Sequence, residues 1–257
     1  MKVCVLVKQV PGSESALRIA PSNTWIEETA ALFEMNESDN YALEEALQIK
    51  EALGNDPEVV VVSMGPERVQ KVMREALAKG ADRGIHINEI TEIKSDPFAT
   101  SQVFANVIKD ENFDLIFTGL QSDDVGSGQT GVILGELLGM ATATLVMATE
   151  VKEVSIRIKR ELESGWFQWV SMPTPASITI QSGINQPRYP SLKGIMGAKK
   201  KEIKVADQTT ITFPEKQQSF GKIYLPTADK KTEMIEGNLD QMVSRLVEVL
   251  KTEIKVL

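Results

Sequence analysis

The sequence predicts an α/β protein built on a doubly wound, mostly parallel β-sheet, and three observations support this fold class. Short apolar runs rich in valine and isoleucine are typical of strands that are buried on both faces of a sheet. These runs alternate with longer stretches in which apolar residues recur at helical spacing. Several runs are followed by small or polar residues, as expected for loops that leave the carboxyl ends of strands. This βαβαβαβα order favours a parallel sheet with helices on both faces.

Four strands and four helices account for the first half of the chain. The expected strands are residues 2–8, 58–63, 84–87 and 114–118, and the expected helices are residues 41–53, 68–78, 97–109 and 132–138. Gly54 follows the first helix, at the position where a left-handed residue often ends one. The polar residues 36–40 before this helix are typical of a turn, and a weak alternation over residues 16–25 indicates a small hairpin.

The pattern changes after about residue 150. Residues 155–162 alternate between apolar and other side chains and Gly165 follows them, so we expect a β-hairpin over residues 154–171. A further strand is expected at residues 176–180. Residues 184–197 contain two prolines and predict a loop.

The C-terminal part has no apolar pattern that could build its own core. The three lysines at 199–201 are typical of a solvated face. Residues 206–229 lack periodicity and predict an extended arm or a long loop that needs another surface. Residues 239–254 predict an amphipathic helix that packs on the sheet domain or on a partner.

These patterns divide the chain into two expected parts. The first is a nucleotide-binding α/β domain over residues 1–205, which includes the hairpin 154–171 and the loop 184–197. The second, residues 206–257, is a C-terminal arm and helix that packs on a partner subunit.

Composition excludes several classes of function. The chain has 257 residues and a formal net charge of −8, which argues against a nucleic-acid partner. One cysteine and one histidine exclude a disulfide framework and a Cys- or His-rich metal site. No run of 18 apolar residues is present, so no membrane span is expected. Because the chain enters a strand directly, we expect no signal peptide and a cytoplasmic location.

The glycine-rich stretch 119–131 is the main candidate for a binding site. It follows the expected strand 114–118 and precedes an expected helix, and it contains aspartates and serines. Glycine lets the backbone approach a ligand closely, and a helix N-terminus offers free N–H groups to an anion. The stretch either holds the phosphate and ribose of an adenine nucleotide or is simply a turn. It matches neither the Walker A pattern nor GxGxxG.

No residue set predicts catalysis. A Ser–His or Cys–His nucleophile would need His86 or Cys4, and both lie in apolar runs that predict strands. We expect His86 to be structural. A nucleotide binder without catalytic groups uses its nucleotide structurally or carries electrons, so we expect no enzyme activity.

Several motifs together give a resemblance to a known family. They are the strings at residues 3–10, 64–66, 76–83, 119–131, 160–161 and 185–189. With them the chain resembles, over nearly its whole length, the β subunit of electron transfer flavoprotein (ETF). The resemblance implies an adenine nucleotide alpha hydrolase-like sheet, a heterodimer with an ETF α subunit, FAD held mainly by that subunit, and AMP in the β subunit.

The resemblance also implies cofactor-binding residues in four segments of the chain. The expected set is Leu6, Asn36, Glu37, Ser38, Asp39, Met64, Gly119, Gln121, Ser122, Asp123, Asp124, Gly126, Ser127, Gly128, Gln129 and Thr130.

Partner recognition is expected in the loop 184–197. For Leu192 and Ile195, buried packing and an exposed anchor for a partner remain as alternatives. The resemblance implies the second, with Leu192 filling a pocket on a primary dehydrogenase that donates electrons, and Tyr189 beside it. It also implies that Glu161 lies at the interface with the mobile flavin domain of the α subunit. The electron acceptor would be a quinone oxidoreductase or another protein.

Two other functions remain open. In an electron-bifurcating ETF a second FAD would replace AMP in the same crevice and be held by the same residues. A free-standing ATP-binding regulator or hydrolase on a similar sheet is the third reading. The arm after residue 206 argues against this third reading, because it predicts a chain that is not stable alone.

Overall fold

The computed structural model describes residues 1–54, 56–88, 96–152, 154–207, 209, 211, 214–226 and 232–256. Their contacts divide the chain into two compact units, Met1–Lys222 and Ile223–Leu257.

A nine-stranded sheet forms the centre of the first unit. Its order is β11-β5-β4-β1-β6-β10-β7-β8-β9, with every pair from β11 to β7 parallel and the last two pairs antiparallel. The strands are β1 (Lys2–Leu6), β4 (Glu58–Gly65), β5 (Arg83–Asn88), β6 (Leu115–Gly119), β7 (Ala141–Lys152), β8 (Ser155–Glu161), β9 (Phe167–Pro173), β10 (Ala176–Ile180) and β11 (Ile203–Val205). The predicted mostly parallel sheet is therefore confirmed.

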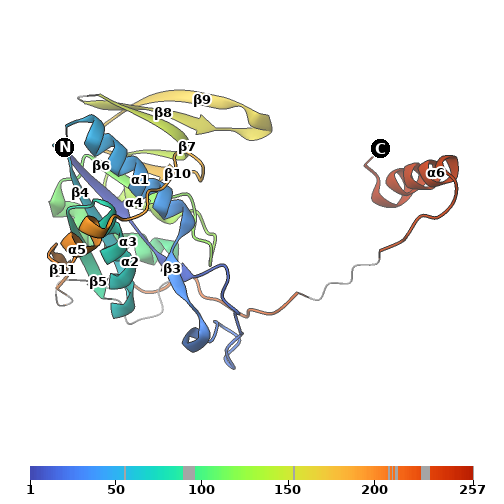
Figure 1. Ribbon diagram of the computed structural model, residues 1–257, viewed down its shortest axis with the longest axis horizontal. Helices are drawn as coiled ribbons and strands as arrows, with labels where there is room; N and C mark the ends of the chain where they lie inside the picture. Colours follow the sequence, from blue (N-terminus) through green and yellow to red (C-terminus); the bar gives the residue numbers. More distant parts are fainter. Residues whose placement is uncertain are drawn as a thin grey trace. The chain divides into compact units, whose positions relative to one another are not determined.

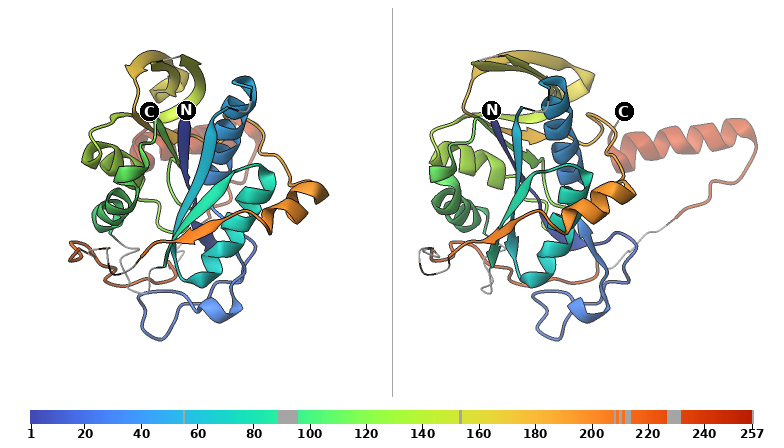
Figure 2. Two further views of the ribbon diagram at one scale, coloured as in Figure 1. Left: turned by 90° about the vertical axis from the view of Figure 1, so that its left-hand side faces the viewer. Right: turned by 60° about the vertical axis from the view of Figure 1, so that its left-hand side comes forward.

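Helices cover both faces of this sheet. On one face lie α1 (Glu37–Ala52), α2 (Gln70–Lys79) and α5 (Leu192–Ala198), and on the other lie α3 (Pro97–Ile108) and α4 (Thr130–Leu137) (Figure 2). A hydrophobic core lies on each face of the sheet, and successive residues of β1 point to opposite faces. Val3 and Val5 pack in one core, and Cys4 and Leu6 pack in the other. This alternation explains why the strand is apolar without interruption, and it confirms the doubly wound arrangement.

Short 3₁₀ turns and a small second sheet complete the first unit. The turns are η1 (Glu28–Ala30), η2 (Glu67–Val69), η4 (Lys109–Glu111) and η5 (Glu163–Gly165), and the second sheet pairs β2 (Gln9–Pro11) with β3 (Phe33–Met35). Figure 1 shows β8 and β9 as a long ribbon beside β7, so the predicted hairpin is confirmed.

The structure corrects several expectations. Asn36 is the N-cap residue of α1, so residues 37–40 form the first turn of this helix and not a separate turn that precedes it. The small hairpin expected over residues 16–25 is reduced to one antiparallel bridge between Ile19 and Ile26, flanked by backbone hydrogen bonds from Ala20 to Trp25 and from Glu27 to Arg18 (both 2.8 Å), and it forms no pair of strands. Part of the expected loop 184–197 is helix α5. The long strand β7 was not predicted, because many of its residues are partly exposed and give no clear alternation.

The first unit extends beyond the expected boundary at residue 205 to Lys222. Ala206 and Ile211 are buried in the core on the α3 side of the sheet. The carboxylate of Asp96 accepts hydrogen bonds from the backbone N–H groups of Gln217 (2.5 Å) and Gln218 (3.1 Å). Apolar burial and one carboxylate thus tie the beginning of the arm to the sheet domain.

The second unit contains helix α6 (Leu239–Val249) and a following π-helical turn, η6 (Leu250–Ile254). A capping box of Asn238 and Gln241 starts α6, as expected for a real helix N-terminus. No residue of this helix is buried within the described chain. Across the described residues we find no helix with the length and apolar character needed to cross a membrane.

Candidate functional site

A cavity of about 480 Å³ lies at the carboxyl ends of β1, β4 and β6. The chain passes from β1 to β4 on one side of the sheet, and later returns to place β6 on the other side of β1. Ligands of open α/β sheets bind in the crevice that such a reversal of strand order creates. The segment after β1, the segment after β4 and residues 118–131 supply most of the cavity lining.

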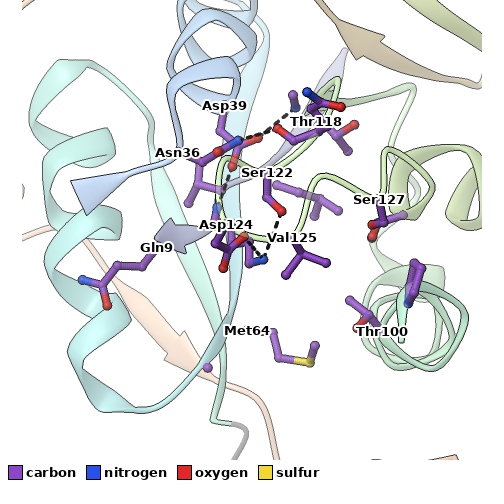
Figure 3. A pocket seen from close by; sticks show the side chains of 18 of the residues that line it. Gln9, Asn36, Asp39, Met64, Thr100, Thr118, Ser122, Asp124, Val125 and Ser127 are labelled. Atoms are coloured by element: carbon purple, nitrogen blue, oxygen red, sulfur yellow. Dashed lines mark hydrogen bonds and ion pairs between the residues drawn. The ribbon is translucent and has the colours of Figure 1, made fainter. Parts of the chain in front are cut away.

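Most of the cofactor-binding residues expected from the sequence line this cavity. They are Leu6, Asn36, Asp39, Met64, Gly119, Gln121, Ser122, Asp124, Ser127, Gly128, Gln129 and Thr130. Glu37, Ser38, Asp123 and Gly126 do not line it. In Figure 3, Met64 and Val125 face the open centre, and Thr100 and Ser127 lie across from Gln9.

The first turn of α1 fixes the glycine-rich loop. Asn36 donates to the carbonyl of Gln121 (3.0 Å) and accepts from the N–H of Asp123 (2.9 Å). Ser38 donates to the same Gln121 carbonyl (2.7 Å), and the N–H of Glu37 donates to Asp123. Glu37, Ser38 and Asp123 therefore fix the loop to the start of α1 without lining the cavity.

Asp39 joins three segments at the floor of the cavity. One of its oxygens accepts from the N–H of Lys8 (2.7 Å) and the other from the N–H of Gly119 (2.9 Å). Burial raises the pKa of the Asp39 carboxyl to about 7, although these hydrogen bonds lower it. Any side chain at Gly119 would collide with Ser38 and Asp39, so glycine is required there.

Lys8 bridges the end of β1 to the glycine-rich loop. Its Nζ lies 2.5 Å from Oδ1 of Asp124 and 3.1 Å from Oγ of Ser122. The Asp124 carboxylate is almost fully buried, while Lys8 is one-third exposed. The loop that could cradle a ligand is thus anchored by an ion pair as well as by backbone hydrogen bonds.

Helix α4 begins at the wall of the cavity. No side chain that the structure describes caps its N-terminus, and Gln129 and Thr130 line the cavity there. Because Gly131 and Gly135 have no side chains, the helix can lie close to the sheet. A Cβ at Gly131 would collide with Thr118, and one at Gly135 with Thr142 and Ser177. Free N–H groups and the positive end of the helix dipole make this end of the cavity suitable for a phosphate.

Three aromatic side chains also line the cavity, and sequence reasoning missed them. They are Trp25, Phe33 and Phe104. The guanidinium of Arg68 lies 3.8 Å from the ring centre of Phe33 and pairs with Glu28 at 2.9 Å. Only the fold brings these residues, which are far apart in the sequence, to the same cavity.

His86 and Cys4 are both buried away from this cavity. The Nε2 of His86 lies 2.9 Å from the carbonyl oxygen of Gly65, and its Nδ1 lies 3.3 Å from Gln70. Burial raises the pKa of the Cys4 thiol, which disfavours the thiolate form. The described residues contain no group of three or more His, Cys, Asp or Glu side chains that could hold a metal ion.

Comparison with known proteins decides the family. A family profile described as an electron transfer flavoprotein domain matches residues 24–211. The electron transfer flavoprotein subunit beta of Methylophilus methylotrophus is 35% identical over 259 residues, which cover 97% of this chain and 98% of that protein. This chain belongs to the ETF β-subunit family. The family predicted from the sequence motifs is therefore confirmed.

Two further relatives show how widely the ETF β-subunit family extends. The electron transfer flavoprotein subunit beta of Bacillus subtilis is 32% identical, and the alignment covers all of both chains. The mitochondrial electron transfer flavoprotein subunit beta of Arabidopsis thaliana is 35% identical and covers 96% of this chain and 97% of its own length.

None of the expected partner-recognition residues is among the residues that line the cavity. Tyr189 is 95% exposed and Leu192 is 83% exposed, and Ile195 is partly exposed. Leu192 begins helix α5, so the alternative of a buried packing leucine is wrong for the chain by itself. Glu161 ends β8 and accepts a hydrogen bond from Gln181 (3.0 Å).

Proposed function

We propose that this chain is the β subunit of a heterodimeric, cytoplasmic electron transfer flavoprotein. It would carry electrons from a primary dehydrogenase to a quinone oxidoreductase or another acceptor, through an FAD held mainly by the α subunit. AMP would occupy the cavity of the β subunit and stabilise the assembly. The main support for this proposal is that a chain of the ETF β-subunit family has a cavity with the N-terminus of α4 at its wall.

The residues of the cavity fit AMP. Its volume of about 480 Å³ is within the ordinary range for small-ligand sites. The start of α4, with Ser127, Gln129 and Thr130, would hold the phosphate. Apolar side chains of Leu6 and Met64 would contact the adenine. The hydroxyl of Thr118 is buried without a hydrogen-bond partner among the described residues and faces the same space.

The cavity lining supports binding more than group transfer. It contains neither histidine nor cysteine, and its carboxylates are engaged: Asp39 accepts backbone hydrogen bonds and Asp124 pairs with Lys8. The electron-transfer chemistry would be supplied by the isoalloxazine of FAD when the two subunits bind it. The residues of this chain would bind and orient, and would not react.

Two exposed surfaces support an obligate partner. The hairpin carries Trp166, Phe167 and Trp169, all at least partly exposed, and Arg157 lies over the Trp169 ring at 4.3 Å. In the second unit, α6 exposes Leu239, Met242, Val243 and Leu246. Groups of exposed apolar side chains of this kind often mark a protein–protein interface. We propose that the ETF α subunit covers them.

A second candidate is an electron-bifurcating ETF with a second FAD in this cavity. The aromatic lining residues Trp25, Phe33 and Phe104 favour this candidate, because they offer contacts beyond those assigned above to the phosphate and adenine of AMP. Arg68, which pairs with Glu28, adds a cation to the lining.

The test is the nucleotide content of the heterodimer. The chain is co-expressed with the ETF α subunit of the same organism, and the purified complex is denatured and its nucleotides are quantified. One FAD and one AMP per heterodimer is the expected result. Two FAD and no AMP would replace the simple carrier by the bifurcating type. Failure to obtain any complex containing flavin would overturn the proposal.

A further inference from the structure

The segment that is expected to recognise a dehydrogenase has an unusual division of its side chains. We call residues 184–201 the recognition segment. Its polar side chains Asn185, Arg188 and Lys201 point back to the domain and make hydrogen bonds there. Ile184, at its start, packs against the core, but Tyr189 and Leu192 are largely exposed and Met196 is 72% exposed. The segment therefore presents apolar groups on a polar base.

Arg188 makes the densest set of contacts in this base. Its Nε donates to Oε2 of Glu44 (2.8 Å) and its Nη2 to Oε1 of the same residue (3.0 Å). The backbone N–H of Arg188 also donates to Glu44 (3.1 Å), and the guanidinium pairs with Glu51. The Glu44 carboxylate is almost fully buried, with 5% of the side chain exposed. Such a fork geometry fixes both the position and the orientation of the loop.

Asn185 reinforces this attachment three residues earlier. Its Nδ2 donates to the carbonyl of Tyr41 (3.1 Å) and to Oε2 of Glu45 (3.0 Å). Glu45 in turn accepts from Thr149 of β7 (2.6 Å). Glu44 and Glu45, which accept these hydrogen bonds, are neighbours on α1. The residues that lead into α5 are therefore attached to a single helix.

The other end of the recognition segment is held by α2. Arg74 donates to the carbonyls of Ala198 (2.7 Å) and Lys201 (2.6 Å). Lys201 donates to the carbonyls of Leu77 (3.0 Å) and Ala81 (2.6 Å), so it is not the solvated lysine that the charge run predicted. Helix α5 is therefore fixed at both ends before any partner binds.

We propose that Arg188 is a positioning residue for recognition of the electron donor. It holds Leu192 and the neighbouring apolar side chains in the geometry in which they enter a pocket of the dehydrogenase, and it does not itself contact that protein. The inference rests on the proposed function, because it assigns a role within the same recognition surface. An anchor that is already ordered loses less conformational entropy on binding, and this raises affinity.

The variants are chosen so that folding and positioning are separated. Arg188→Lys keeps the charge beside the buried Glu44 carboxylate but loses the fork. Glu44→Gln with Arg188→Gln removes the pair without leaving a buried charge unpaired. Leu192→Ala removes the anchor itself, and Leu192→Ala with Arg188→Lys tests whether Arg188 acts through it. Each is made in the co-expressed heterodimer with the α subunit.

The first measurement is steady-state reduction of the heterodimer by the primary dehydrogenase that reduces the wild-type complex. We expect Arg188→Lys to raise the KM for the heterodimer about tenfold, the size expected for losing a preorganised contact, with kcat and FAD content unchanged. In the Leu192→Ala background the same change should have no further effect. Reduction by dithionite, which needs no docking, should be equal in all variants.

Each other outcome has a definite meaning. An unchanged KM for Arg188→Lys overturns the proposal. An equal rise of KM in the Leu192→Ala background also overturns it, because Arg188 would then contact the dehydrogenase directly. If Leu192→Ala itself leaves KM unchanged, Leu192 does not bind the dehydrogenase. That result overturns the recognition surface assumed in the proposed function, and it is distinct from the failure of Arg188 as a positioning residue.

A second measurement needs no dehydrogenase. Amide hydrogen exchange of the heterodimer should become faster in peptides covering residues 189–198 of Arg188→Lys and of the double Gln variant. Peptides covering residues 119–131 should exchange as in the wild type. Unchanged exchange over residues 189–198 would show that the fork does not order the segment.

Discussion

The glycine-rich loop and the recognition segment are both fixed by helix α1, yet one lines a cavity and the other exposes apolar side chains to solvent. The first turn of α1 holds the loop 119–131 through Asn36, Ser38 and Asp39, and the loop encloses a cavity. The middle of α1 holds the recognition segment through Glu44 and Glu45, and that segment exposes Tyr189, Leu192 and Met196.

The difference lies in where the polar groups point. The loop lines the cavity with residues such as Ser127, Gln129 and Thr130, and side chains of α1 hold it through hydrogen bonds. In the recognition segment, Asn185 and Arg188 bind α1, while Tyr189, Leu192 and Met196 are exposed to solvent. The same helix thus fixes both the loop that lines the cavity and the segment with exposed apolar side chains.

The largest expected effect comes from the close contact of the loop with α1. A Cβ at position 119 would lie 2.8 Å from the backbone nitrogen of Asp39, which cannot move without breaking the first turn of α1. Gly119→Ala should cost about 3 kcal/mol and lower the thermal midpoint of the heterodimer by roughly 10 °C. The control, Gly126→Ala, has only a positive φ (+66°) and a nearest contact at 3.9 Å. It should cost about 1 kcal/mol. Equal effects would contradict the close-contact explanation.

A smaller effect is expected from a charge at the start of α4. Thr130→Arg should fill the proposed phosphate position and expel the nucleotide. The complex would lose the stabilisation that the nucleotide provides, about 2.7 kcal/mol when the ligand is present at 100 times its Kd. Thr252→Arg adds the same charge in the second unit, outside the cavity lining, and should leave the nucleotide content unchanged. Full nucleotide content in Thr130→Arg, measured after denaturation, would place the ligand elsewhere.

The ion pair beneath the loop should contribute less. Lys8→Met leaves Asp124 and Ser122 without their shared donor, and we expect about 1.5 kcal/mol weaker nucleotide binding, or roughly tenfold in Kd. Lys50→Met is the matched control, since it removes an ion pair of the same length, 2.5 Å to Asp82, away from the cavity. Titration of the nucleotide-free heterodimer with AMP gives both constants. Equal weakening by both variants would assign the effect to general destabilisation.

The smallest effect concerns pH and the recognition segment. Burial alone would raise the pKa of Glu44, but hydrogen bonds from Arg188 and Gln48 lower it below its usual value. The stabilisation by the pair is therefore complete above the pKa of an unfolded glutamate, about 4.3, and is lost as pH falls through the lower folded-state pKa.

The difference in stability between the wild type and the double variant Glu44→Gln with Arg188→Gln, roughly 1 kcal/mol at pH 7, should shrink toward pH 3. Thermal midpoints across this range measure it. A difference that does not change with pH would show that the ionised pair is not its source.

Sequence patterns predicted the parts of this molecule whose burial is complete or strictly periodic. Strands such as β1 and β4 were found because both of their faces are covered, which leaves a continuous apolar run. The edge strand β11 and the partly exposed β7 were missed, since exposure on one side weakens the pattern. The start of α1 was missed for a functional reason: its first turn is polar because it binds the loop 119–131.

Sequence patterns likewise predicted only part of the candidate site. The loop 119–131 was identified from its own glycines and the strand before it, while the aromatic lining residues were not, because Trp25, Phe33 and Phe104 lie in separate parts of the chain and share no motif. The exposure of Leu192 and the attachment of Arg188 to Glu44 also needed the fold.

The sequence by itself determined the fold class, the position of the glycine-rich loop and the family. These depend on runs of neighbouring residues, where propensity, burial pattern and motif can be read along the chain. Only the tertiary structure decided which side chains meet. Asp39 binds Lys8 and Gly119, which are 31 and 80 residues away, and Arg188 binds Glu44, which is 144 residues away. Contacts over such separations are set by the packing of elements, and no local pattern contains them.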